Sequence, residues 1–170
     1  PTYREREVKA EIASMEYAKI KNFSGLTNNR YGEVITIEQR QQDYINIYAG
    51  DYYDARTDTM YKGISEEKMK DITHEANVEL LMGMQIVSAL KVDYAEVYLK
   101  EKEEALREAE AKLADNENKT TEQKEDELKD IEAKRNELDA AKSNLSNAQA
   151  ELDNVTKLLE KFRQGDGDPD

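Results

Sequence analysis

The chain has 170 residues, of which 38% are apolar and 37% are charged, and its net charge is −13. This composition favours helices with narrow buried stripes over a thick globular core. The acidic excess argues against nucleic acid as a partner, and no apolar run approaches the roughly 18 residues of a spanning helix, so we expect no membrane insertion. The lack of cysteine excludes disulfides and thiolate chemistry.

The first 64 residues predict two helices and a loop. Thr2 and Glu5 form a capping-box signature, and apolar residues at helical spacing follow, which predicts a helix over 3–21. A second helix is expected over 27–49, with Gly50 as its C-cap. The β-branched run at 33–37 (EVITI) favours a strand instead. Residues 50–64 are expected to form an irregular loop.

A third helix is predicted over 65–114, capped by Ser65. Its first half is apolar over a broad arc, so we expect more than one partner to cover it. The arc is formed by Met69, Ile72, Ala76, Leu80, Met84, Val87, Leu90, Tyr94 and Val97. Beyond Tyr98 the apolar stripe narrows to a seam for a single partner helix.

A fourth helix is predicted over 121–163, where apolar residues recur every seven positions. The repeat consists of Ile131, Leu138, Leu145, Leu152 and Leu159. A turn at 115–120 would fold this helix back and bring Leu99 near Leu138 and Leu90 near Leu145. The alternative is one uninterrupted helix over 65–163.

The expected fold is therefore all-α, a helical bundle with a long antiparallel coiled-coil hairpin. Residues 1–164 would form a single module, the hairpin would project over about 99–137, and 165–170 would be a flexible linker.

The sequence offers little for catalysis. His74 is the only histidine, and the chain has no glycine-rich phosphate loop and no nucleophile or zinc motif. The acidic stretch from Asp115 begins like a calcium loop, but Thr120 stands where that loop requires glycine. We expect no enzymatic activity, no cofactor and no metal site.

Tyrosine carries the strongest signal for function. All ten tyrosines precede residue 99, and several gather around the loop at 50–64. Tyrosine is enriched in protein interfaces, so we expect an exposed recognition surface for a protein partner. Tyr44 and Tyr48 lie on a heptad face, which favours the core for both. The candidate binding residues are Tyr52, Tyr53, Tyr61, Arg56 and Tyr48.

Residues 101–113 (EKEEALREAEAKL), 132–142 (EAKRNELDAAK) and 147–152 (NAQAEL) resemble helical regions of cell-wall-anchored surface proteins of streptococci and related Gram-positive cocci, of the group B streptococcal adhesin and M-like types. The resemblance covers about 99–163. It implies an extracellular module, anchored or secreted at the bacterial surface, that binds a host protein such as a complement regulator, an immunoglobulin, a matrix protein or an epithelial receptor. Acidic flanks would select a basic partner.

Two other functions stay open. The chain could be an intracellular coiled-coil scaffold that self-associates, or a surface-exclusion or phage-structural component. Oligomeric state distinguishes the adhesin from the scaffold, because a scaffold should be a concentration-dependent dimer or higher, whereas an internally paired hairpin predicts an elongated monomer. For the binding module we expect a monomer, with a dimer as the alternative.

Overall fold

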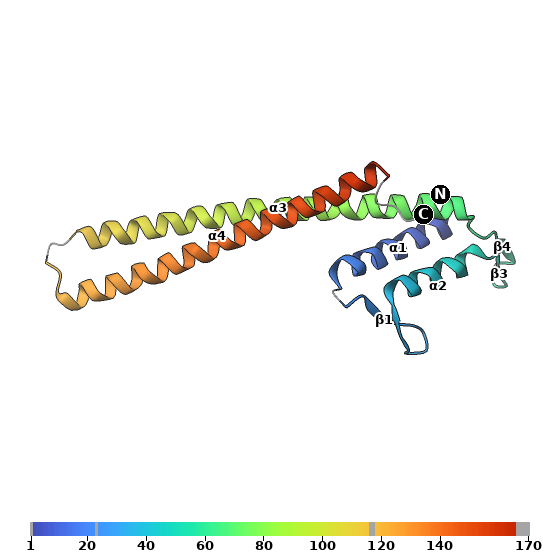
Figure 1. The fold of residues 1–170 in the computed structure, drawn as a ribbon, viewed down its shortest axis with the longest axis horizontal. Helices are drawn as coiled ribbons and strands as arrows, with labels where there is room; N and C mark the ends of the chain where they lie inside the picture. Colours follow the sequence, from blue (N-terminus) through green and yellow to red (C-terminus); the bar gives the residue numbers. More distant parts are fainter. Residues whose placement is uncertain (1, 23, 116–117, 166–170) are drawn as a thin grey trace. The chain divides into compact units, whose positions relative to one another are not determined.

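The computed structural model describes residues 2–22, 24–115 and 118–165 (Figure 1). Within them the elements follow the order α1 (Tyr3–Lys21), β1 (Leu26–Asn28), β2 (Val34–Thr36), α2 (Ile37–Ala49), β3 (Tyr52–Asp54), β4 (Thr59–Tyr61), α3 (Glu66–Ala114) and α4 (Thr121–Arg163). Helices dominate, and each pair of strands forms a separate antiparallel hairpin. The chain divides into two compact units, one made of residues up to Met82 with those from Leu158 onward, and one spanning Gly83–Lys157.

The core of the first unit lies where α1 meets the start of α3. Val8 and Ile12, one helical turn apart on α1, are fully buried. They cluster with Ile64 and three residues of α3, and side chains of α2 pack against this cluster. The α3 residues are Met69, Ile72 and Ala76. One stripe on each helix thus supplies the core. On α1 the capping box at Thr2 sets the start of the helix, and the spacing of the apolar residues after it indicates the buried stripe.

The expectation of one helix over 27–49 is wrong in its first ten residues. β1 and β2 pair there, with Thr27 opposite Ile35, and α2 begins only at Ile37. Gly32 has φ +83° at the turn, a conformation that glycine adopts without strain. Thr36 then forms a complete capping box with Gln39. The β-branched run therefore decides the local structure, and the cap decides where the helix starts.

The second unit is a helical hairpin in which α3 and α4 run antiparallel. Polar pairs across it show the register: Gln85 contacts Thr156 at 3.2 Å, Lys91 contacts Glu151 at 3.6 Å, Lys102 contacts Glu137 at 3.1 Å and Glu110 contacts Arg135 at 3.9 Å. The Lys102 pair raises the pKa of that amine, mainly through its hydrogen bond to Glu137. The buried seam includes Ser88, Val92, Ile131, Ala141 and Val155. The unit is longer than the expected hairpin of 99–137.

The expectation that α3's broad apolar arc is covered is met at Met69, Ile72 and Ala76, which are buried, and is wrong from Val87 onward. The expected proximity of Leu90 to Leu145 is wrong as well. Leu90 is 61% exposed, whereas Val92 is 9% exposed. Residues two apart on a helix lie on nearly opposite faces, so α4 covers the face of Val92 and leaves that of Leu90 open. Small Ser88 and half-buried Ala95 share the covered face. Because one partner helix covers one stripe only, the arc beyond it stays in solvent.

The α3–α4 seam is tested by replacing a small buried residue with a large one. Ala141 is 1% exposed on α4 and its neighbour Ala140 is exposed. Ala141→Leu should lower the free energy of unfolding by about 1–3 kcal/mol, because added methylene groups overpack a close helix contact. Ala140→Leu is the matched control and should change it by less than about 0.5 kcal/mol. Urea unfolding followed by circular dichroism measures both. Equal effects would place Ala141 outside the seam.

Candidate protein-binding site

The candidate site lies on the β3–β4 hairpin, where the sequence suggested an irregular loop. Tyr52 pairs with Tyr61, and Tyr53 with Met60. Since side chains alternate between the faces of a strand, Tyr52 and Tyr61 share one face and Tyr53 and Met60 share the other. The rings of Tyr52 and Tyr61 are stacked, 6.2 Å apart with an interplanar angle of 23°. The alternation of side chains along these three-residue strands is too short to recognise in the sequence, yet it places exposed tyrosines on both faces of the hairpin.

The three tyrosines and the methionine of this tyrosine hairpin, which we define as residues 51–63, are exposed. Tyr52 and Tyr53 are each 52% exposed, Met60 58% and Tyr61 37%. Three candidate residues from the sequence thus lie together in solvent. Met60 belongs with them, and only the cross-strand register identifies it. Its flexible thioether is suited to adaptable contacts.

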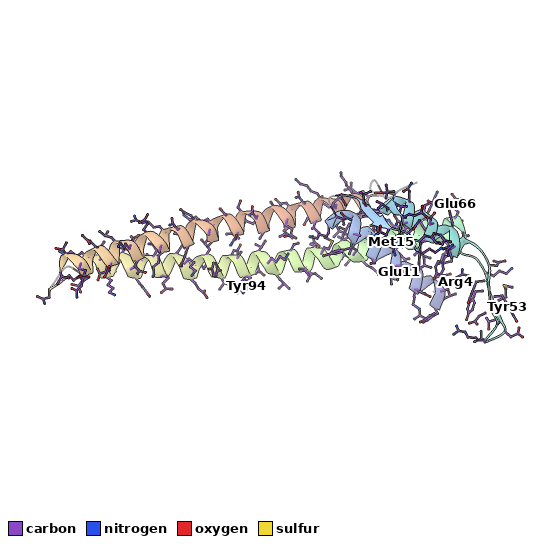
Figure 2. The ribbon with its side chains drawn as sticks, turned by 90° about the horizontal axis from the view of Figure 1, so that it is seen from below. Arg4, Glu11, Met15, Tyr53, Glu66 and Tyr94 are labelled. Carbon is purple, nitrogen blue, oxygen red and sulfur yellow. The ribbon has the colours of Figure 1, made fainter. Side chains whose placement is uncertain are left out.

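Arg4, at the start of α1, holds the base of the hairpin (Figure 2). Its guanidinium donates hydrogen bonds to the carbonyl of Gly50 at 3.2 Å and to that of Lys62 at 3.4 Å, one on each arm. The same group lies over the rings of Tyr48, at 4.9 Å, and Tyr52, at 5.8 Å. A planar cation can donate at its edge and stack on its face at once. No sequence signal connects Arg4 to residues some fifty positions later.

The tip of the hairpin is shaped by two aspartates. Asp54 is buried and accepts from the Arg56 backbone N–H at 3.0 Å and from the Arg56 Nε at 3.4 Å, while the Arg56 side chain stays largely exposed. Asp58 has φ 50° and accepts a hydrogen bond from the Tyr53 hydroxyl. That hydrogen bond raises the pKa of Tyr53, because it stabilises the protonated phenol. Tyr53 therefore presents a neutral ring whose hydroxyl already donates its hydrogen bond to Asp58.

Tyr48 lies between the candidate site and the core of the first unit. It is half-buried on α2, its ring centroid lies 4.7 Å from that of Tyr44, and its hydroxyl donates to Glu7 at 3.4 Å. Both tyrosines pack against the core of the first unit. Burial is the main cause that raises the pKa of Tyr44. Of the five candidate residues, Tyr52, Tyr53, Tyr61 and Arg56 are thus presented to solvent, whereas Tyr48 connects them to the core.

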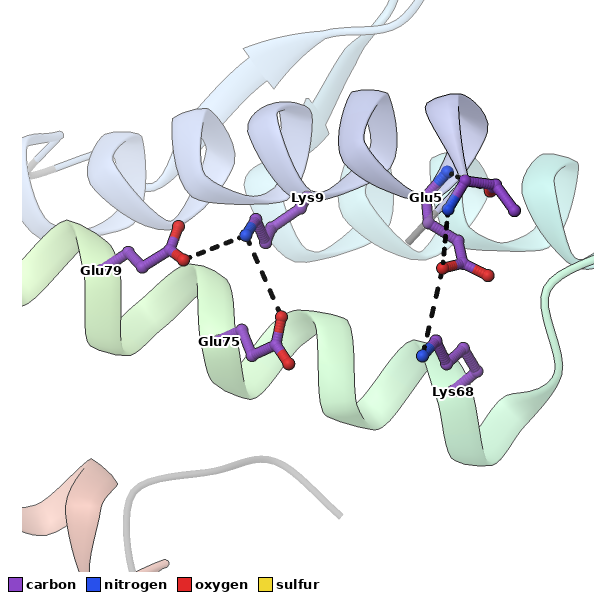
Figure 3. A network of polar contacts seen from close by, with 6 residues as sticks. Glu5, Lys9, Lys68, Glu75 and Glu79 are labelled. Atoms are coloured by element: carbon purple, nitrogen blue, oxygen red, sulfur yellow. Dashed lines mark hydrogen bonds and ion pairs between the residues drawn. The ribbon is translucent and has the colours of Figure 1, made fainter.

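The first unit has two other surfaces on which side chains from different elements meet. Where α1 faces α3, Lys9 pairs with Glu79 at 3.0 Å and Glu75 at 3.9 Å, and Lys68 lies 4.0 Å from Glu5 (Figure 3). Exposed pairs of this kind contribute little stability. Beside the β1–β2 hairpin, an open groove of about 560 Å³ is lined in part by Tyr31, Arg40, Asp43 and Ile47. Neither surface concentrates aromatic side chains as the tyrosine hairpin does.

The described residues hold no group of three or more metal-ligating side chains. Across the same part of the chain, no helix is both long and apolar enough to traverse a bilayer. Comparison of the chain with known protein families, curated proteins and solved structures finds no match. The site therefore has to be interpreted from its own geometry.

Gly63 provides a test of the hairpin base. A methyl group on Gly63 would lie 2.1 Å from the Ala49 carbonyl oxygen, whereas one on Gly83, within α3, would meet open space. The Gly63 N–H also donates to Asp51 at 2.7 Å. Gly63→Ala should therefore cost about 1–3 kcal/mol through overpacking. Gly83→Ala should raise stability by about 0.5–1 kcal/mol, since alanine favours helix. Thermal unfolding of both variants measures this, and a neutral Gly63→Ala would contradict the close approach.

Proposed function

We propose that this chain is the extracellular binding module of a bacterial surface adhesin, and that its tyrosine hairpin recognises a host protein. The module acts by surface recognition and needs no catalysis or cofactor. The likeness of residues 99–163 to helical streptococcal surface proteins supports a place on the cell surface, anchored to the wall or secreted. Candidate partners are a complement regulator, an immunoglobulin, a matrix protein or an epithelial receptor.

The observation that carries this proposal is the exposure of Tyr52, Tyr53, Met60 and Tyr61 on one short hairpin. A cluster of large side chains in solvent is unusual for an isolated soluble domain and is typical of interaction sites. Tyrosine contributes wide contact area for little lost conformational entropy. A protein partner would therefore bury these rings at a small ordering cost.

The local framework supports the same conclusion. The stacked pair of Tyr52 and Tyr61 and the cation–π contacts of Arg4 hold the rings in place before a partner arrives. Affinity benefits when contact groups are ordered in advance. Asp51 and Asp58 flank the rings, and the chain as a whole is acidic. Acidic flanks around an aromatic centre favour a partner with a basic rim.

The proposal is tested by capture and then by direct binding. The immobilised chain is exposed to human plasma and to epithelial lysate, and retained proteins are identified. Each is then titrated against wild type and against Tyr52→Ala with Tyr61→Ala. We expect one retained protein to lose at least about tenfold in affinity, because central aromatic residues dominate interface energy.

The matched control is Tyr17→Ala with Tyr31→Ala, which removes two exposed tyrosines outside the hairpin; they are 46% and 72% exposed. It should bind as wild type does. Circular dichroism checks that both double variants keep their helix. If every retained protein binds the hairpin variant as well as wild type, the hairpin is not the site, and if nothing is retained, the adhesin function is rejected.

A further inference from the structure

The groove between α2 and the β1–β2 hairpin is a second candidate site, and no residue of the tyrosine hairpin lines it. Four of its lining residues come from α2 at positions i, i+3, i+4 and i+7, so they form one face of that helix. They are Arg40, Asp43, Tyr44 and Ile47. The β1–β2 hairpin beside α2 supplies the other wall (Figure 1). Its contribution includes Asn28, Arg30, Tyr31 and Ile35.

The groove has an apolar interior and a polar rim. Ile35 and Tyr44 are half-buried. The exposed lining residues that carry a charge or a side-chain amide are Asn28, Arg30, Arg40, Asp43 and Asn46. The volume of about 560 Å³ is that of a small-molecule site. A wholly apolar ligand is excluded, because the rim would lose water without gaining hydrogen bonds.

Arg40 is held in place by β1 and keeps donors for a ligand. Its Nη1 donates to the carbonyl of Asn28 at 2.9 Å and to the hydroxyl of Thr27 at 3.3 Å. These are the hydrogen bonds of its guanidinium within the described residues, and they use two of its five N–H donors. The edge formed by Nε and Nη2 stays available. Two parallel N–H groups on one edge bind both oxygens of a carboxylate.

The hairpin wall adds a second cation and an aromatic ring. The Arg30 guanidinium lies 5.0 Å from the centroid of the Tyr31 ring. That ring is 72% exposed, so most of its surface is open to a ligand. The negative face of an aromatic ring attracts groups that carry partial positive charge, which include the C–H groups of a sugar ring.

The charge of the groove lining is opposite to that of the chain. Arg30 and Arg40 supply two positive charges and Asp43 one negative charge, in a chain of net charge −13. Within the described residues the ion pairs involve cations other than these two arginines. Glu33 and Glu38 are close in the sequence but do not line the groove. Charges beyond about 8 Å are largely screened at physiological salt, so the lining favours a ligand with one negative charge.

We propose that this groove binds a sugar that carries a carboxylate. Arg40 and Arg30 bind the carboxylate from the two walls, and the Tyr31 ring packs against the C–H face of the sugar. Asp43 accepts hydrogen bonds from the hydroxyl groups, and the amides of the rim bind others, since a hydroxyl both donates and accepts. The groove is separate from the tyrosine hairpin, so this binding does not depend on recognition of a host protein.

Two other kinds of anionic ligand fit the lining less well. A phosphate group brings up to two negative charges beside Asp43, and a nucleic acid would be repelled by the acidic chain as well. An acidic peptide would bring several carboxylates to a rim with two cations. It would also cover an area typical of protein interfaces, which is larger than this groove offers.

The ligand class is tested by titrating the ¹⁵N-labelled chain and following NMR chemical shifts. The probes are 3′-sialyllactose and methyl β-glucuronide, which carry the two common sugar acids, the methyl ester of each, and triglutamate. We expect at least one acidic sugar to bind with a Kd on the order of 1 mM or tighter. Its ester should bind at least about tenfold more weakly, because the charge-assisted hydrogen bonds are lost.

Three outcomes of these titrations would overturn the proposal. One is that neither acidic sugar binds, and another is that the esters bind as tightly as the acids. Tighter binding of triglutamate than of both sugars would assign the groove to acidic peptides instead.

The site is tested with two arginine variants. Arg40→Lys keeps the charge and removes the parallel donors, and Arg30→Gln leaves the hydrogen bonds of Arg40 in place; each should weaken binding at least about fivefold. Arg107→Gln removes one charge from an exposed residue of α3 and is the matched control. It should change the Kd by less than about twofold, since distant exposed charges are screened. Wild-type binding by both groove variants, or an equal loss in the control, overturns the site. Circular dichroism confirms that each variant is folded.

Crossed variants separate this site from the tyrosine hairpin. Tyr52→Ala with Tyr61→Ala should bind the acidic sugar as wild type does, because neither residue lines the groove. Tyr17→Ala with Tyr31→Ala should weaken sugar binding at least about fivefold and leave host-protein binding unchanged, because a stacking ring is lost only from the groove. Loss of sugar binding in the first variant alone would place the sugar on the tyrosine hairpin and overturn the proposal.

Discussion

The structure depends on one constraint, which is that each helix of this highly charged chain can bury little more than one narrow stripe. Helix α4 has a single stripe and would not be stable alone. Its pairing with α3 buries Ile131, Ala141 and Val155 on α4 and, on α3, Ser88 and Val92. The same limit applies in the first unit, where α1 contributes mainly Val8 and Ile12 to the core. Helices paired in this way leave their other faces to solvent.

The constraint explains why the exposed features of this chain are informative. Charged residues make up 37% of this chain, so polar side chains are plentiful for its surface. Large apolar side chains that are nevertheless exposed therefore call for an explanation. Among the described residues this happens on the tyrosine hairpin, on the face of α3 that carries Leu90 and Tyr94, and beside the β1–β2 hairpin, where Tyr31 and Val34 are exposed. The first is an ordered aromatic cluster, and the second is a helix face that α4 leaves uncovered.

Arg4 connects the fold of the first unit to its candidate site. Its hydrogen bonds to Gly50 and Lys62 join both arms of the hairpin to α1, and its face contacts Tyr48 and Tyr52. Two-stranded hairpins are marginal by themselves. The tyrosine hairpin is stable enough to present its rings because a charged group from another element satisfies its backbone and stacks on its side chains.

The sequence by itself determined the elements whose signals are local and repeated. The heptads after residue 121 specify α4, and Thr2 with Glu5 specifies the start of α1. The tyrosines pointed to the segment of the candidate site for the same reason, since composition is local. Tertiary structure decided the features that depend on which distant segments contact each other. These are the strand pairing within residues 33–37, the choice of the α3 stripe that packs against α4, and the contacts of Arg4 with the tyrosine hairpin. Leu90 and Val92 are equally apolar in the sequence. Only packing against α4, through small neighbours such as Ser88 that allow close approach, buries one and exposes the other.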